Sequence, residues 1–142
     1  MQQRVSLITL GVKDMAKSAT FYKALGWGRV DSPDGVVAFD LIGQTLGLYP
    51  LDALAKDLGL PVEELGAGRA TLGYNTAEKA DVAPLLAKAE AAGARILKTA
   101  QDVFWGGHHG YFADLEGHIW EISHNPFSPL GPKGEFQWNG AA

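Results

Sequence analysis

The sequence runs through one order of elements twice, and this repeat limits the folds open to the chain. Thr9-Leu-Gly11 and Thr71-Leu-Gly73 each lie in a strand-like segment, and each is followed by a helix-like segment that stops at a glycine. Gly43 and Gly117 stand at matching hairpin turns later in each half. One such unit cannot cover its own sheet, so two units are expected to pair and share a core.

The first half predicts a strand, a helix and then three short strands. Residues Val5 to Val12 are rich in β-branched side chains, Asp14 is a suitable N-cap, and Gly26 stops the helix that follows. The three strands are predicted at Trp27 to Asp31, Val36 to Leu41 and Thr45 to Tyr49.

The second half restarts after a broken helical piece, Pro50 to Leu65, and the glycine-rich break Gly66-Ala-Gly68. Thr76 or Asp81 is expected to cap its helix, which ends at Gly93. The predicted strands are Ala70 to Asn75, Arg95 to Lys98, Tyr111 to Ala113 and His118 to Ile122, the last two forming a hairpin.

These elements predict an α+β fold in which two tandem βαβββ modules form a curved mixed sheet around a concave cup. The 142 residues are expected to form a single domain. Its expected parts are a first module, 4–50, a helical connector, 51–68, a second module, 69–125, and a C-terminal tail, 126–142.

Composition excludes several functional classes. The chain has no cysteine, which rules out disulfides, thiolate metal sites and thiol catalysis and agrees with a cytoplasmic location. The net charge is −4 without a basic cluster, so no nucleic-acid partner is expected. No segment approaches the length of a membrane span, and no membrane partner is expected.

Glu121 is the candidate for chemistry because it is a carboxylate among apolar strand residues. A buried carboxylate needs a metal, a donor or water beside it, or it takes up a proton. Glu121 could therefore be a structural residue paired with Arg69 or protonated, or it could be an acid/base or a hydrogen-bond acceptor for a ligand. Asp40 is a second strand carboxylate, and it is expected to face solvent.

Four histidines accompany this carboxylate. His108 and His109 fall in a glycine-flanked loop before the hairpin, where they are either exposed residues without a role or candidates to contact a ligand. Adjacent residues of an extended chain point to opposite faces, so at most one can join Glu121. His118 alternates away from Glu121, and His124 leads into the tail. Two histidines together with Glu121 could form a displaced metal site.

Aromatic residues suggest what the cup would bind. The candidates to line it are Trp105, Tyr49, Tyr74, Phe104 and Tyr111, whereas Trp120 alternates away from Glu121 and is expected to pack under a helix. Such a surface suits an uncharged or cationic planar ligand. The sequence has no phosphate-binding glycine loop and no nucleophile elbow.

Two segments carry a resemblance to a known family: LGVKDMAKSATFYKALG at residues 10–26 and GYFADLEGHIWEISHN at residues 110–125. With the duplicated order of elements over residues 4–125, the chain resembles the vicinal-oxygen-chelate superfamily of glyoxalase I, bleomycin-resistance proteins and extradiol dioxygenases. The resemblance implies the fold above and a homodimer.

The resemblance also implies where metal ligands would stand. In metal-using members they come from the first and last strands of each half, as His, Gln or Glu. The corresponding positions here fall on Leu7, Gly47, Arg69 or Ala70, and Glu121. Only Glu121 is a ligand type, so no metal or other cofactor is expected, with a divalent metal at Glu121 as the alternative.

Three functions remain open. In the first, the protein binds a small apolar or aromatic molecule in its cup without catalysis. In the second, it is a glyoxalase-like lyase or isomerase, or a dioxygenase, with Glu121 as acid/base or metal ligand. In the third, it is a structural or interaction module that docks through Phe127 to Trp138.

Overall fold

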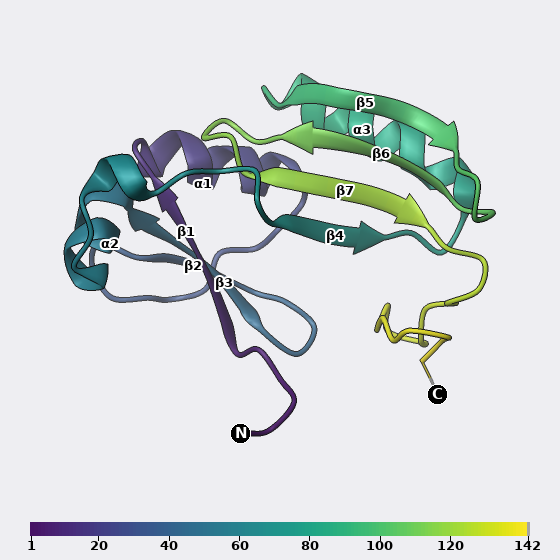
Figure 1. Ribbon diagram of the computed structural model, residues 1–142, viewed down its shortest axis with the longest axis horizontal. Helices are drawn as coiled ribbons and strands as arrows, with labels where there is room; N and C mark the ends of the chain where they lie inside the picture. Colours follow the sequence, from purple (N-terminus) through teal and green to yellow (C-terminus); the bar gives the residue numbers. More distant parts are fainter. Residues whose placement is uncertain (142) are drawn as a thin grey trace. The chain divides into compact units, whose positions relative to one another are not determined.

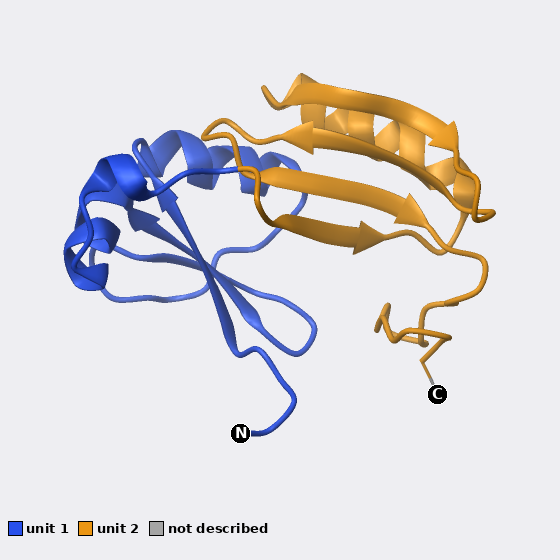
Figure 2. Ribbon diagram, viewed as in Figure 1, with its two compact units in different colours: residues 1–67 blue, residues 68–142 orange. Residues whose placement is uncertain are grey.

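The computed structural model describes residues 1–141 and divides the chain into two compact units (Figures 1 and 2). The first ends at Ala67 and the second begins at Gly68, inside the connector predicted at 51–68. Each unit contains helices and a mixed sheet, as the α+β prediction requires. None of the helices in the described chain has the length and apolar character needed to span a membrane.

The first unit is built on a three-stranded sheet. Its elements are β1 (Leu7–Val12), α1 (Met15–Ala24), β2 (Val37–Asp40), β3 (Thr45–Pro50), α2 (Leu51–Leu58) and the 3-10 turn η1 (Val62–Glu64). The strand order is β1-β3-β2, with β1 parallel and β2 antiparallel to β3. Asp14 caps α1 as predicted, because its carboxylate accepts the Lys17 amide proton at 3.0 Å.

The strand predicted at Trp27 to Asp31 is wrong. Only Val30 pairs, in an isolated bridge to Ala38. Gly26 adopts φ 107° at the end of α1, and the Trp27 ring then stacks on Tyr22 with centroids 5.5 Å apart. The segment is therefore held to α1 through Trp27, and it contributes one bridge to the sheet instead of a strand.

Aromatic and aliphatic residues of the helix and sheet form the core of the first unit. The side chains that are almost completely buried are Val12, Phe21, Tyr22, Phe39, Leu46 and Leu48. Along β1 and β3 these residues alternate with others that point to the opposite face, as the two-residue period of a strand dictates.

The second unit has a four-stranded sheet and one α-helix. Its elements are β4 (Thr71–Asn75), the 3-10 turn η2 (Lys79–Asp81), α3 (Val82–Ala91), β5 (Arg95–Asp102), β6 (His108–Ala113) and β7 (Ile119–His124). The order is β4-β7-β6-β5, with β4 parallel to β7 and the other pairs antiparallel. The predicted hairpin is present, but β6 starts earlier than expected, so His108 and His109 lie in a strand and not in a loop.

Helix α3 covers one face of this sheet. A Cβ on Gly110 would collide with Leu86 of α3, so Gly110 and the residues that alternate with it face the helix. Phe112 and Trp120 lie on that face with stacked rings 6.3 Å apart, and Trp120 is only 6% exposed. Trp120 therefore packs under a helix, as predicted.

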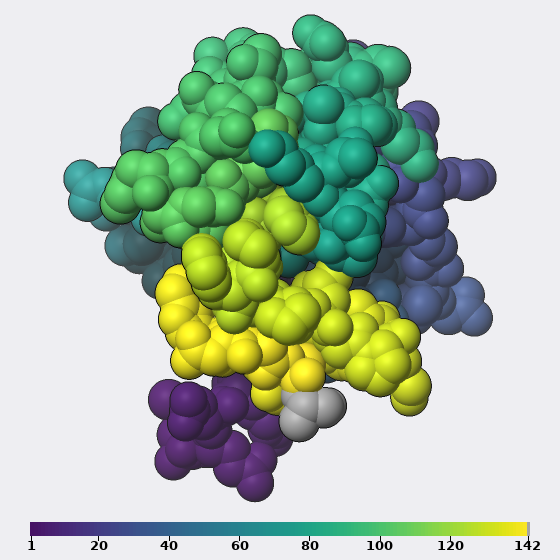
Figure 3. All heavy atoms as spheres, turned by 90° about the vertical axis from the view of Figure 1, so that its right-hand side faces the viewer, coloured from purple at the N-terminus to yellow at the C-terminus, as the bar shows by residue number. Residues whose placement is uncertain are grey.

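The tail after β7 folds into a compact loop on its own unit, and its atoms gather together in Figure 3. The hydroxyl of buried Ser128 accepts the Asn139 amide at 3.0 Å and the Asn125 side-chain amide at 3.3 Å. Phe127 and Trp138 stay exposed. The tail thus has internal order, and its predicted docking role stays a prediction.

We expect Gly110→Ala to destabilise the protein by about 1–3 kcal/mol, because the added methyl overfills the contact between β6 and α3. It would lie against Leu86 and 2.7 Å from the carbonyl oxygen of Lys98. Urea unfolding measures the change. Gly28→Ala is the control, since nothing in the described part of the chain lies within 4 Å of its added methyl. An equal effect of both substitutions would contradict this packing.

Candidate functional site

Glu121 lies on the face of the second sheet that is opposite α3. It occupies β7, a central strand, and pairs with Tyr111 of β6 on one side and with Gly73 of β4 on the other. Paired residues share a face, whereas the neighbouring Trp120 points to the helix. The strand period that buries Trp120 therefore turns Glu121 away from the apolar core.

Two hydrogen-bonding groups hold the carboxylate. The Tyr111 hydroxyl donates to Oε2 at 2.8 Å, and His109 Nδ1 lies 3.3 Å from Oε1. The Glu121 side chain remains 26% exposed. No ion pair joins it to Arg69 in the described part of the chain, so that pairing, one alternative from the sequence, is not observed.

The Tyr111 hydroxyl stays protonated at neutral pH. Burial, followed by the hydrogen bond to Glu121 and the negative charge of that carboxylate, raises the pKa of Tyr111 to about 12. A protonated phenol can only donate toward an ionised carboxylate. Tyr111 therefore orients Glu121 and does not exchange a proton with it under ordinary conditions.

His109 holds the other carboxylate oxygen. Its side chain is 12% exposed, and its ring meets Tyr111 edge-on with centroids 5.0 Å apart. An ionised Glu121 favours the tautomer with the proton on Nδ1. Nε2 then carries a lone pair, and within residues 1–141 this buried atom has no hydrogen-bond partner. A buried acceptor without a donor is costly, so the site has unused hydrogen-bonding capacity beside Glu121.

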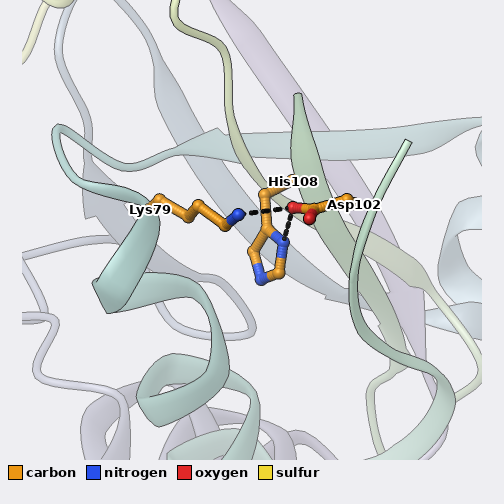
Figure 4. Close-up of polar contacts among 3 residues, drawn as sticks. All are labelled: Lys79, Asp102 and His108. Carbon is orange, nitrogen blue, oxygen red and sulfur yellow. Dashed lines mark hydrogen bonds and ion pairs between the residues drawn. The ribbon is translucent and has the colours of Figure 1, made fainter. Parts of the chain in front are cut away.

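His108 is engaged elsewhere, on the helix side of the sheet. Figure 4 shows the Asp102 carboxylate between His108 Nδ1, at 2.8 Å, and Lys79 Nζ, at 2.6 Å. The hydrogen bonds from Lys79 and then from His108 hold the pKa of Asp102 below its ordinary value. As expected for adjacent strand residues, only one histidine of the pair reaches Glu121.

The structure does not bring all the predicted aromatics to Glu121. Tyr74 pairs with Ile122, so it lies on the helix face of its sheet. Trp105 sits in the turn between β5 and β6 with its ring over Gly107, and Phe104 beside it is fully exposed. Of the four candidates in the second unit, only Tyr111 is hydrogen-bonded to Glu121.

Tyr49 belongs to the first unit, at the end of β3. A hydrogen bond with Asp57 of α2, followed by the charge of that carboxylate, raises the pKa of Tyr49. Its hydroxyl thus interacts with a carboxylate of its own unit.

Gly73 is a feature that the sequence analysis did not assign to the site. It appeared there only as part of the repeated Thr-Leu-Gly pattern. The signal that could have identified it is the parallel pairing of the first and last strands of each half, which aligns Gly73 with Glu121.

The donor set around Glu121 does not fit a tightly held metal ion. Within the described residues, no three His, Cys, Asp or Glu side chains lie close enough together to hold one. The carboxylate and His109 Nδ1 are directed at each other. In the first unit, the residue corresponding to Glu121 is Gly47 by the turn glycines, or Tyr49 by the residue paired with the Thr-Leu-Gly glycine. Neither is a carboxylate or an imidazole.

We expect Glu121→Gln to lower the pKa of Tyr111 from about 12 while leaving it above the ordinary value, because burial is the larger cause. NMR titration of the tyrosine ring carbons, with Tyr111→Phe to assign the signal, measures it. In the unmodified protein the folded state holds this proton more tightly than the unfolded chain. Its contribution to stability is therefore complete below about pH 10 and is lost as the pH rises toward 12. An unchanged pKa in Glu121→Gln would contradict the hydrogen bond.

Comparisons with known proteins agree with this architecture. A solved structure described as a glyoxalase-related enzyme from Fulvimarina pelagi is 34% identical, covers 96% of this chain and 99% of its own, and gives a TM-score of 0.89. The hypothetical protein SA1046 from S. aureus is 24% identical over 88% of this chain and 95% of its own, with a TM-score of 0.77. Lactoylglutathione lyase from Agrobacterium tumefaciens is 21% identical over 88% and 96%, with a TM-score of 0.67.

A search of curated proteins found no match. The family model, in contrast, matches residues 4–122, which include both repeated units and Glu121. The chain therefore belongs to the Glyoxalase/Bleomycin resistance protein/Dioxygenase superfamily.

Proposed function

We propose that this protein binds a small, mostly apolar or aromatic molecule on the open face of its second sheet, with Glu121 as the polar anchor. The observation that carries the proposal is the carboxylate of Glu121, held by Tyr111 and His109 and still 26% exposed. A carboxylate fixed by two donors is pre-oriented, and it keeps lone pairs for a third group.

The chemistry of the site selects the ligand's polar end. An ionised carboxylate only accepts hydrogen bonds, so the ligand must present a hydroxyl, an amide N–H or a cationic N–H group. A charged donor gives the shorter and stronger bond. The rest of the ligand would lie against the aromatic edge formed by Tyr111 and His109, which suits a planar ring.

Two amidines test the anchor without knowledge of the natural ligand. Benzamidine and acetamidine carry the same planar cationic group, and they differ in having a ring or a methyl. We expect both to shift the NMR amide signals of Glu121 and Tyr111. We expect Glu121→Gln to weaken both by about tenfold or more, because the charge-assisted bond is lost.

Asp40→Asn is the matched control. Asp40 is also a strand carboxylate that accepts a hydroxyl proton, from Thr45 at 2.7 Å, but it belongs to the first unit. We expect amidine binding by Asp40→Asn to equal that of the unmodified protein. Equal binding by Glu121→Gln, or no binding of either amidine to the unmodified protein, would overturn the anchor.

A second candidate function is proton transfer next to a carbonyl, as in a lyase or isomerase. Its support is the pairing of Glu121 with the His109 imidazole, together with the 34% identity to a protein described as a glyoxalase-related enzyme. Glu121 would take the proton from the hydroxyl-bearing carbon beside the carbonyl and return it to the carbonyl carbon. The hydroxyl proton passes to the original carbonyl oxygen, so the composition of the molecule is unchanged.

Proton exchange tests this candidate. Lactoylglutathione, which is part of the name of the lyase from Agrobacterium tumefaciens, can be used directly as a probe. Turnover, or incorporation of deuterium from D₂O that disappears in Glu121→Gln, supports catalysis. If the protein binds amidines but shows neither turnover nor deuterium incorporation, binding remains the function.

The proposal includes a homodimer and no resident metal. Light scattering tests the first, and a single-chain mass would contradict it. Metal analysis of the purified protein tests the second, because a stoichiometric divalent metal would contradict it.

Removal of residues 127–142 tests a docking role of the tail. Such a role predicts that the shortened protein has a changed oligomeric state or set of partners.

A further inference from the structure

Gly73 lies next to Glu121 without a structural reason to be glycine. It pairs with Glu121 across β4 and β7, and it is exposed in β4, an edge strand of the sheet. Its backbone does not adopt the left-handed conformation that favours glycine, and a Cβ built on it would meet no atom of residues 1–141 within 4 Å. Glycine weakens a strand, and one reason for it in a strand is the close approach of a ligand or another backbone.

The matching glycine of the first unit shows what such a position can hold. Gly11 closes the same Thr-Leu-Gly pattern in β1. A Cβ on Gly11 would lie 2.7 Å from Leu51 Cδ1 and 3.0 Å from Leu54 Cδ2, both of α2. Gly11 thus has a packing role, because apolar side chains of its own unit rest on the bare backbone there.

The second unit has no helix in the corresponding place. Helix α2 begins directly after β3, whereas the chain after β7 turns at Asn125 into the proline-rich tail. Among residues 1–141, nothing lies within 4 Å of a Cβ built on Gly73, whereas Leu51 and Leu54 both lie that close to a Cβ built on Gly11. In the first unit, leucine side chains of α2 therefore cover the bare backbone at Gly11. In the second unit, the bare backbone at Gly73 is uncovered, and it lies beside Glu121.

We infer that Gly73 is the specificity-determining residue of the site, and that the flat apolar part of the ligand lies on its bare backbone. This inference rests on the proposed function. Adjacent strands are about 4.8 Å apart, so a ring attached directly to a donor group at Glu121 can reach over the neighbouring strand at Gly73. The ligand class is then a single planar ring that carries a hydroxyl, amide or amidine donor.

Gly73→Val tests the inference. Valine favours strands, and its Cβ has free space, so the variant should fold with unchanged or higher stability in urea unfolding. Its branched side chain would occupy the space over residue 73, beside Glu121. We expect benzamidine to bind about tenfold more weakly, whereas acetamidine, whose methyl does not extend over Gly73, should change less than about twofold. Gly73→Ala should lie between these two.

The control is Gly28→Val in the first unit, where again no described residue comes within 4 Å of the added Cβ. This variant should bind both amidines as the unmodified protein does. Equal benzamidine binding by Gly73→Val and the unmodified protein would overturn the inference. A strongly destabilised Gly73→Val would also overturn it, because Gly73 would then serve packing. Loss of both amidines in Glu121→Gln with no ring selectivity in Gly73→Val would leave the proposed function standing alone.

Discussion

The parallel pairing of the first and last strands of the second unit is the constraint on which the site depends. It places β7 between β4 and β6, so Glu121 has a neighbour on each side, Gly73 and Tyr111. The antiparallel pairing of β6 and β7 alone would bring Tyr111 to Glu121, but it would not determine which residue lies on the other side of the carboxylate. Because strand register allows only steps of two residues on a given face, a one-residue slip would direct Glu121 into the apolar layer under α3.

The two faces of this sheet therefore carry different chemistry on alternate residues of the same two strands, β6 and β7. On the helix side, Phe112 and Trp120 stack and are almost fully buried. On the other side, Tyr111 and Glu121 form a hydrogen bond at 2.8 Å in partial contact with water. An ionised carboxylate is costly in an apolar layer but stable where donors and water remain. The alternation thus allows one strand to stabilise the fold and to present a polar group.

Much of this arrangement could be predicted from the sequence. The repeat and the turn glycines determined the two units and the hairpin, and alternation predicted that Trp120 and Glu121 point to opposite faces. The strand at Trp27 to Asp31 was wrong because packing of Trp27 on Tyr22 overrides a short β-like pattern. The partners of Glu121 could not be named, since the register that brings Tyr111 and Gly73 to it depends on turn length and strand pairing. Tyr74 was grouped with Tyr111 because aromatic content says nothing about which face a strand residue takes.

The difference between the two halves explains why the candidate site lies in only one of them. In the first unit, the strand glycine Gly11 is covered by Leu51 and Leu54, and its partner across the sheet is Tyr49. In the second unit, the same pattern has open space above Gly73 and a carboxylate beside it. The second unit keeps its apolar layer under α3, whose Val82, Leu86 and Ala89 are buried. The opposite face of its sheet therefore presents Glu121 beside Gly73, whereas Leu51 and Leu54 of α2 lie over the matching glycine of the first unit.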